Sequence, residues 1–189
     1  MKERVREAMF NLVGPECRGR HVIDLFAGTG AIGLEAMSRG AESATFIERH
    51  VPTSRAVAEN VDRLGVGDCS ELLVTSAFLW AKRDLPHVAA AAEMWVGAGW
   101  PWIVFCSPPF DFYVSRRAEM HALIGRMLRS APLGSTLVVE ADERLDFGAL
   151  PRAWGETAGA ENDETSSAEW DIRSYPPAFI GLLRDPRQN

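Results

Sequence analysis

Residues 24–33 read Asp-Leu-Phe-Ala-Gly-Thr-Gly-Ala-Ile-Gly, a glycine-rich segment that joins a predicted strand to a predicted helix. The apolar run at His21–Phe26 predicts a buried strand that leads directly into the glycines. Residues 31–39 then predict a helix that ends at Gly40. Glycines let the backbone pass close to a ligand, and the first turn of a helix carries N–H groups without partners. The alternative interpretation is a turn of small residues needed only for packing, and the strand–turn–helix context favours a ligand.

The same alternation of strand and helix continues along the chain. Further strands are expected at Ser43–Glu48, Glu71–Thr75, Trp102–Cys106, Gly134–Glu140, Trp170–Tyr175 and Phe179–Arg184. Further helices are expected at residues 2–12, 52–64, 77–83 and 115–130. Strands that alternate with helices predict right-handed crossovers and a mostly parallel sheet. We therefore expect a Rossmann-like α/β fold.

The whole of residues 1–189 is expected to form a single domain. It begins with an N-terminal helix within residues 1–14, and residues 155–169 are a polar connection. Between residues 84 and 100 the pattern is less regular; the run AAAAE favours a helix and GAGWP a loop.

Composition excludes several classes of protein. The net charge of −6 argues against a basic surface that binds nucleic acid nonspecifically, although it leaves room for a local basic patch. The three cysteines, at 17, 69 and 106, form neither a disulfide framework nor a zinc pattern, so no metal site is expected. No apolar run approaches the roughly 20 residues that span a bilayer. The first ten residues have no apolar signal core, and we expect a cytoplasmic protein without membrane contact.

The glycine turn and the strand after it indicate a nucleoside ligand. Gly28, Gly30 and Gly33 satisfy the G-x-G-x-x-G pattern, and Glu48 ends the next strand, where a carboxylate can accept hydrogen bonds from ribose hydroxyls. By itself Glu48 is more readily read as a solvated carboxylate at a strand end. NAD and S-adenosylmethionine (SAM) both fit this pattern. Asp24 favours SAM, because a carboxylate is tolerable near a sulfonium and awkward beside a pyrophosphate.

A second indication of SAM follows the third strand. Ser76-Ala77-Phe78 occupies the position where a methyltransferase contacts the adenine of SAM, although Phe78 is equally well explained as part of the core.

Ser107-Pro108-Pro109-Phe110 follows the fourth strand, at the sheet edge where ligands bind in such folds. Consecutive prolines stiffen the loop and leave carbonyls free to face a ligand. The Ser107 side chain and the Pro108 carbonyl are candidates to accept the two N–H bonds of a nucleobase amine, and Phe110 is a candidate to stack on the base. The alternative is a rigid surface turn with an aromatic plug. Cys106, at the end of an apolar strand, is interpreted as a buried structural thiol and not as a nucleophile.

These segments together resemble the bacterial methyltransferases that modify N2 of a guanine in 16S ribosomal RNA. The resemblance covers nearly the whole chain. The stretches that carry it are Arg4–Asn11 (RVREAMFN), Asp24–Ala41, Phe46–Glu48, Asn60 and Arg173–Tyr175 (RSY). It implies a class I SAM methyltransferase fold, a mostly parallel seven-stranded sheet with helices on both faces and an antiparallel last strand. The family usually has Asp at the position where this chain has Ser107. The family also carries a basic arm before the N-terminal helix.

The resemblance assigns roles to particular residues. The residues expected to bind SAM are Asp24, Phe26, Ala27, Gly28, Thr29, Gly30, Glu48, Arg49, Ser76, Ala77 and Phe78. The residues expected to hold the base and support catalysis are Ser107, Pro108, Pro109 and Phe110. The expected partner is ribosomal RNA or the assembling small ribosomal subunit, and the chain is expected to be a monomer. Candidates for phosphate contacts are Lys2, Arg4, Arg6, Arg116 and Arg117.

Three alternatives stay open at this point. Ser107 is a neutral acceptor where the family has a charged one, so the chain is either an active guanine-N2 methyltransferase or a SAM- or RNA-binding relative that has lost catalysis. An NAD-dependent enzyme uses a similar glycine turn. An amino-methyltransferase acting on DNA or on a protein amide shares the Pro-Pro-Phe tetrad.

Overall fold

The computed structural model describes residues 3–85, 100–155 and 168–187. The expected helix at residues 89–93 lies outside these ranges, as do the start of the expected loop at 97–101 and most of the polar connection at 155–169. The helices are α1 (Glu3–Val13), α2 (Ala31–Ser38), α3 (Val51–Leu64), α4 (Ala77–Arg83), α6 (Phe112–Ser115) and α7 (Arg117–Ser130). The strands are β1 (His21–Asp24), β2 (Ser43–Ile47), β3 (Ser70–Leu73), β4 (Trp102–Cys106), β5 (Thr136–Ala141), β6 (Asp171–Tyr175) and β7 (Ala178–Arg184).

Within the described residues, the seven strands form one sheet in the order β3-β2-β1-β4-β5-β7-β6. Strands β1 to β5 pair in parallel, while β7 is antiparallel to both of its neighbours. The order reverses at β1, which lies between β2 and β4 and so marks the topological switch point where such sheets bind ligands. The expected α/β fold with an antiparallel last strand is confirmed.

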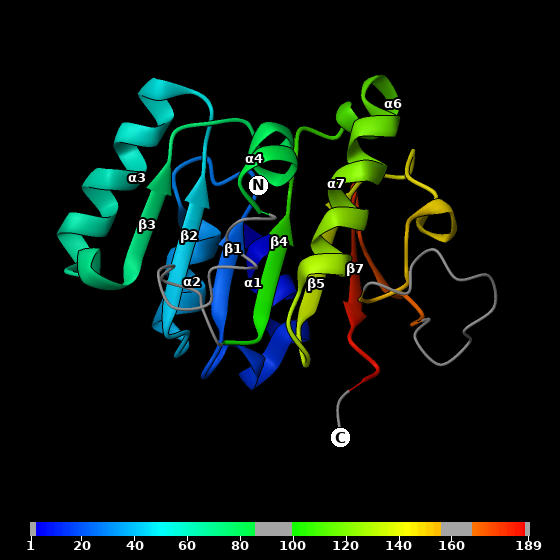
Figure 1. Ribbon diagram of the computed structural model, residues 1–189, viewed down its shortest axis with the longest axis horizontal. Coiled ribbons are helices and arrows are strands. Elements are labelled where there is room, and N and C mark those ends of the chain that lie inside the picture. Colours follow the sequence, from blue (N-terminus) through cyan, green and yellow to red (C-terminus); the bar gives the residue numbers. More distant parts are fainter. Residues whose placement is uncertain (1–2, 86–99, 156–167, 188–189) are drawn as a thin grey trace.

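Helices cover both faces of this sheet, with α4 and α7 in front of it and α1 and α2 behind it in Figure 1. Successive residues of β1 alternate between two apolar cores because side chains of a strand point to opposite faces. Val22 belongs to the core beneath α1, α2 and α3, and Ile23 to the core beneath α4 and α7. Because helices pack against both faces of the sheet, the carboxyl ends of the strands lie between two helical layers.

The expected helix at 115–130 is wrong in its first part. Two helices replace it, α6 and α7, and Arg116 stands between them with φ −128° and ψ 32°, outside the helical region. The Arg116 guanidinium lies 4.1 Å from the ring centre of Phe78 on another element. The interruption lets α6 follow the tetrad directly and turns Arg116 toward the sheet edge.

The glycines between β1 and α2 serve different purposes. Gly28 (φ 56°) and Gly30 (φ 82°) adopt the left-handed conformation that other residues rarely take. Gly33 lies within α2, where an added Cβ would come 2.3 Å from Cε1 of Phe46 on β2. Two glycines therefore shape the turn, while the third lets the helix approach the sheet.

Asp24 supports the turn from below. The side chain is completely buried, and its Oδ2 accepts a hydrogen bond from the N–H of Gly33 at 3.2 Å. Burial raises the pKa of Asp24 from 3.8 to about 7, more than the Gly33 N–H lowers it. Its Oδ1 has no hydrogen-bond partner among the described residues. A buried carboxyl group is thus held directly under the first turn of α2.

Replacing Gly33 with Ala should destabilise the fold by about 1–3 kcal/mol, because the new methyl group collides with the Phe46 ring. Chemical denaturation measures this change. Gly67→Ala is the matched control, since its Cβ meets no atom within 4 Å and its φ is ordinary. Equal stabilities for the two variants would contradict the assigned contact, and Phe46→Leu should recover part of the loss in the Gly33→Ala background.

Replacing Asp24 with Asn should change how stability depends on pH. The folded chain keeps the Asp24 proton up to about pH 7, whereas the unfolded chain releases it near 3.8, so this carboxyl stabilises the fold at low pH and the contribution is lost as pH rises between these values. Wild type should therefore lose stability relative to Asp24→Asn by up to about 1.4 kcal/mol per pH unit in this window. Denaturation curves from pH 4 to 8 test this, with exposed Asp62→Asn as control. Parallel curves for wild type and Asp24→Asn would refute it.

Candidate active site

A cavity of about 650 Å³ opens at the carboxyl edge of the sheet, around the switch point at β1. Its wall comes from the segments that follow β1, β2, β3 and β4, together with α6 and the end of β5. Its volume falls within the range of about 300–1,000 Å³ typical of small-molecule sites. The cavity is therefore large enough for a nucleoside and a group beside it.

Most of the residues expected to bind a nucleoside lie on this wall. Those that line it are Phe26, Gly28, Glu48, Arg49, Ser76, Ala77 and Phe78. Those that do not line it are Asp24, Ala27, Thr29 and Gly30. Asp24 is buried beneath the turn and Gly30 is buried within it, while Thr29 is exposed and its carbonyl accepts a hydrogen bond from Asn60 Nδ2 at 3.0 Å. These four shape the turn from outside the cavity.

Glu48 occupies the corner between two loops. Its Oε2 accepts a hydrogen bond from the Gly28 N–H at 2.9 Å, and its Oε1 accepts one from the His50 N–H at 2.7 Å. An added Cβ at Gly28 would meet no atom within 4 Å, so the turn faces open space beside this carboxylate. A fixed carboxylate beside an open turn suits hydroxyl groups of a ribose.

An aromatic cluster forms another part of the wall. The ring centres of Phe26, Phe78 and Phe112 lie 5.9 to 6.2 Å apart. Arg116 covers two of them, at 4.1 Å from Phe78 and 5.1 Å from Phe112, and pairs with Glu119 at 2.6 Å. Such cation–π contacts contribute about 0.5–2 kcal/mol each. Arg116, expected from the sequence to contact phosphate, is thus packed on the cavity wall.

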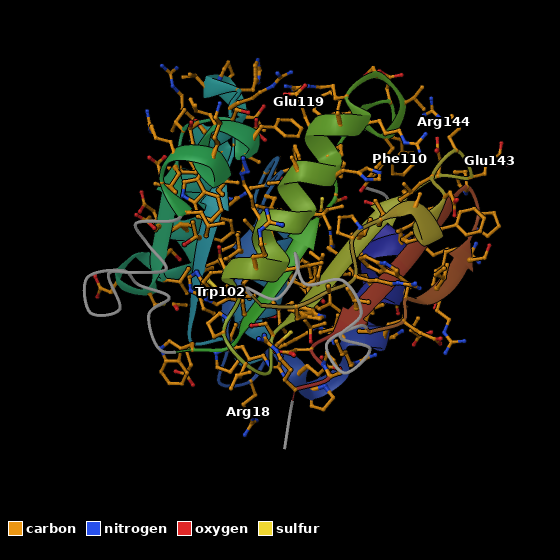
Figure 2. All side chains as sticks on the ribbon, turned by 45° about the vertical axis from the view of Figure 1, so that its right-hand side comes forward. Arg18, Trp102, Phe110, Glu119, Glu143 and Arg144 are labelled. Carbon is orange, nitrogen blue, oxygen red and sulfur yellow. The ribbon has the colours of Figure 1, made fainter. Side chains whose placement is uncertain are left out.

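All four residues of the Ser-Pro-Pro-Phe tetrad line the same cavity. The Pro109 carbonyl accepts a hydrogen bond from the Phe112 N–H at 2.9 Å, and the Phe110 carbonyl accepts one from the Tyr113 N–H at 3.2 Å. No described residue donates a hydrogen bond to the Pro108 carbonyl. Figure 2 shows Phe110 at the carboxyl edge of the sheet, whereas Trp102, at the start of β4, lies toward the opposite edge. The tetrad is a fixed turn that leads into α6.

Glu140 is a site residue that the sequence reasoning missed. It is only 4% exposed, it lines the cavity, and Ser107 Oγ donates a hydrogen bond to its Oε2. Burial raises the pKa of Glu140, and the hydrogen bond from Ser107 opposes the rise. The available signal was an acidic residue at the end of a predicted buried strand, the same signal that singled out Glu48. Its use required the knowledge that β5 lies beside β4.

Cys106 takes no part in this wall. The thiol is completely buried, and its Sγ lies 3.9 Å from the Tyr113 hydroxyl. Burial raises the pKa of Cys106 to about 12, so the thiol stays protonated and is a poor nucleophile. The structure agrees with its interpretation as a structural residue.

The expected basic patch is only partly free. Arg6 pairs with Glu35 at 3.3 Å, while Arg4 and Arg117 are exposed; Lys2 lies outside the described residues.

Among the residues that the structure describes, no three His, Cys, Asp or Glu side chains are grouped as metal ligands. In the same residues no helix has the length and apolar character to cross a membrane.

Comparisons with known proteins show the family of the chain. The family described as "Conserved hypothetical protein 95" matches residues 1–165. Ribosomal RNA small subunit methyltransferase D of Escherichia coli K12 is 29% identical over 154 residues, which are 80% of this chain and 68% of that protein.

Solved structures show the same fold. The Escherichia coli protein yhhF has a TM-score of 0.70 at 23% identity, over 99% of this chain and 88% of that one. An RNA methyltransferase from Salinibacter ruber in complex with S-adenosyl-L-homocysteine has a TM-score of 0.63 at 14% identity, over 100% of this chain and 95% of that one. The match over residues 1–165 is decisive: the chain belongs to the family described as conserved hypothetical protein 95, a SAM-dependent methyltransferase family.

Proposed function

We propose that the chain transfers a methyl group from SAM to the exocyclic N2 of a guanine in small-subunit ribosomal RNA. One observation carries the proposal: a single cavity joins the nucleoside wall at Gly28, Glu48 and Phe78 to the rigid tetrad at residues 107–110. Further support comes from the similarity to an rRNA small subunit methyltransferase and from the fold shared with an RNA methyltransferase bound to S-adenosyl-L-homocysteine.

The turn fits SAM better than NAD. A dinucleotide pyrophosphate needs free N–H groups at the start of the helix. Here the Gly28 N–H is bonded to Glu48 and the Gly33 N–H to Asp24, so neither N–H is free to bind a phosphate. A cationic sulfonium is compatible with this surrounding, and a pyrophosphate is repelled wherever these groups are ionised.

SAM, when bound, supplies an electrophilic methyl group on a positively charged sulfur. Glu48 would hold its ribose and Phe78 would wall its adenine. The base has to leave its stack to reach the tetrad, where Phe110 would stack on it. Ser107 Oγ and the Pro108 carbonyl would accept hydrogen bonds from the two N–H groups of the amine. These hydrogen bonds would direct its lone pair toward the methyl group. Most of the acceleration then comes from positioning the two reactants, which removes the entropy of their encounter.

The proposed function is tested with tritiated SAM offered to naked rRNA, to assembled small subunits and to DNA. We expect label in RNA, and nucleoside analysis of the digest should find it as N2-methylguanosine. Label on cytosine, on adenine or only in DNA would reject the guanine-N2 assignment. SAM binding without transfer to any nucleic acid would favour the relative that has lost catalysis.

Glu48→Gln should weaken SAM and S-adenosylhomocysteine binding by about 1–3 kcal/mol, because the amide cannot provide charge-assisted bonds to the ribose. Calorimetry measures the affinities. Glu59→Gln removes the same charge from an exposed position on α3 and should bind like wild type. Unchanged affinity in Glu48→Gln would remove Glu48 from the ligand site, and tighter binding of NAD than of SAM by wild type would overturn the choice of ligand.

Phe110→Ala should lower kcat/KM for RNA roughly fivefold to 150-fold, since a stacked base is worth about 1–3 kcal/mol. SAM affinity should stay as in wild type, because stacking concerns the base alone. Phe110→Tyr keeps the aromatic face and should retain most of the rate. If Phe110→Leu and Phe110→Tyr were equally active, the residue would act as an apolar plug and not as a stacking surface.

A further inference from the structure

We propose that Glu140 is a positioning residue for methyl transfer, and that it acts by fixing the Ser107 hydroxyl as a hydrogen-bond acceptor for the substrate amine. This inference rests on the proposed function, because it names the group that the site presents to an amine. The family pattern has a charged aspartate at position 107, and the inference assigns that charge to Glu140 on the neighbouring strand β5. Ser107 and Glu140 both line the cavity, and Ser107 Oγ donates a hydrogen bond to Glu140 Oε2.

The polarity follows from the chemistry of a hydroxyl group. Serine has one hydrogen to donate and two lone pairs that accept. Because the hydrogen is given to Glu140, only acceptor positions remain for a group in the cavity. The negative charge beside the hydroxyl also strengthens those acceptor positions, since neighbouring hydrogen bonds polarise one another. A nucleobase amine, which has two N–H donors, is the kind of group that such an acceptor selects.

The fold fixes this contact through strand register. Cys106 on β4 is paired with Val139 on β5, so the next residues along the two parallel strands, Ser107 and Glu140, stand side by side. The Tyr113 hydroxyl donates a hydrogen bond to the Glu140 carbonyl at 3.1 Å, which ties the same residue to α6. Glu140 is therefore held both through its side chain and through its backbone.

This arrangement changes what a Ser107→Asp variant should do. From the sequence alone, aspartate at 107 would be expected to raise the rate, because it restores the charged acceptor of the family pattern. In the structure a second carboxylate at 107 would contact Glu140, and two like charges at that distance force one group to keep its proton. The charge should help only when Glu140 is neutralised at the same time.

The experiment is single-turnover methyl transfer to rRNA at saturating SAM, with calorimetry of SAM binding for each variant. Glu140→Gln should lower the rate about tenfold, the difference between a charged and a neutral hydrogen bond, and leave SAM affinity unchanged. Glu140→Gln in a Ser107→Ala background should cause no further loss. The double variant Ser107→Asp/Glu140→Gln should recover activity relative to either single variant. Exposed Glu143→Gln, which removes a charge close by in the chain, should behave like wild type.

The outcomes separate this inference from the function on which it rests. An inactive wild type overturns the proposed function and, with it, this role. An active wild type with a fully active Glu140→Gln, or an equal loss from Glu140→Gln in both backgrounds, overturns only the role of Glu140. If Glu140→Gln fails to fold, Glu140→Asp replaces it, because it keeps the charge but withdraws the carboxylate from Ser107. A full rate in Glu140→Asp would equally contradict the inference.

Discussion

Two carboxyl groups hold the turn between β1 and α2, Asp24 from below and Glu48 from the side of the cavity. Asp24 accepts a hydrogen bond from the Gly33 N–H, and Glu48 accepts one from the Gly28 N–H, so neither N–H is available to a phosphate. These two hydrogen bonds fix the turn at the carboxyl edge of the sheet. When ionised, the two groups repel anionic ligands from the turn, and Glu48 places a carboxylate on the cavity wall close to where the strand order reverses.

The second half of the cavity depends on strand register. Cys106, the last residue of β4, pairs with Val139, and β5 continues to Ala141, so the tetrad after β4 lies beside the last residues of β5. A neutral serine in the tetrad is thereby joined to a buried glutamate. On the role we propose for Glu140, the charge that the family pattern places at residue 107 comes instead from the next strand, and the Ser107–Glu140 pair replaces a single aspartate.

Sequence patterns predicted the central strands well, because every residue of β1, β2, β4 and β5 is buried. They also predicted the walls contributed by single loops, such as Gly28 and Phe78, since local motifs specify these. They failed where the answer depends on which strands are neighbours. Glu140 is recognised only once β5 is known to lie beside β4, and the helix break at Arg116 reflects a tertiary contact with Phe78. Asp24 was assigned to the ligand, whereas the structure places its carboxyl group under the turn and outside the cavity wall.

A crystal structure grown with S-adenosylhomocysteine would show whether one cavity holds the nucleoside and presents the transferred group to the tetrad. We expect the ribose hydroxyls on Glu48, the adenine against Phe78 and the sulfur on the side of the cavity that faces Ser107. A ligand bound elsewhere, or a cavity that stays empty at saturating concentration, would contradict it.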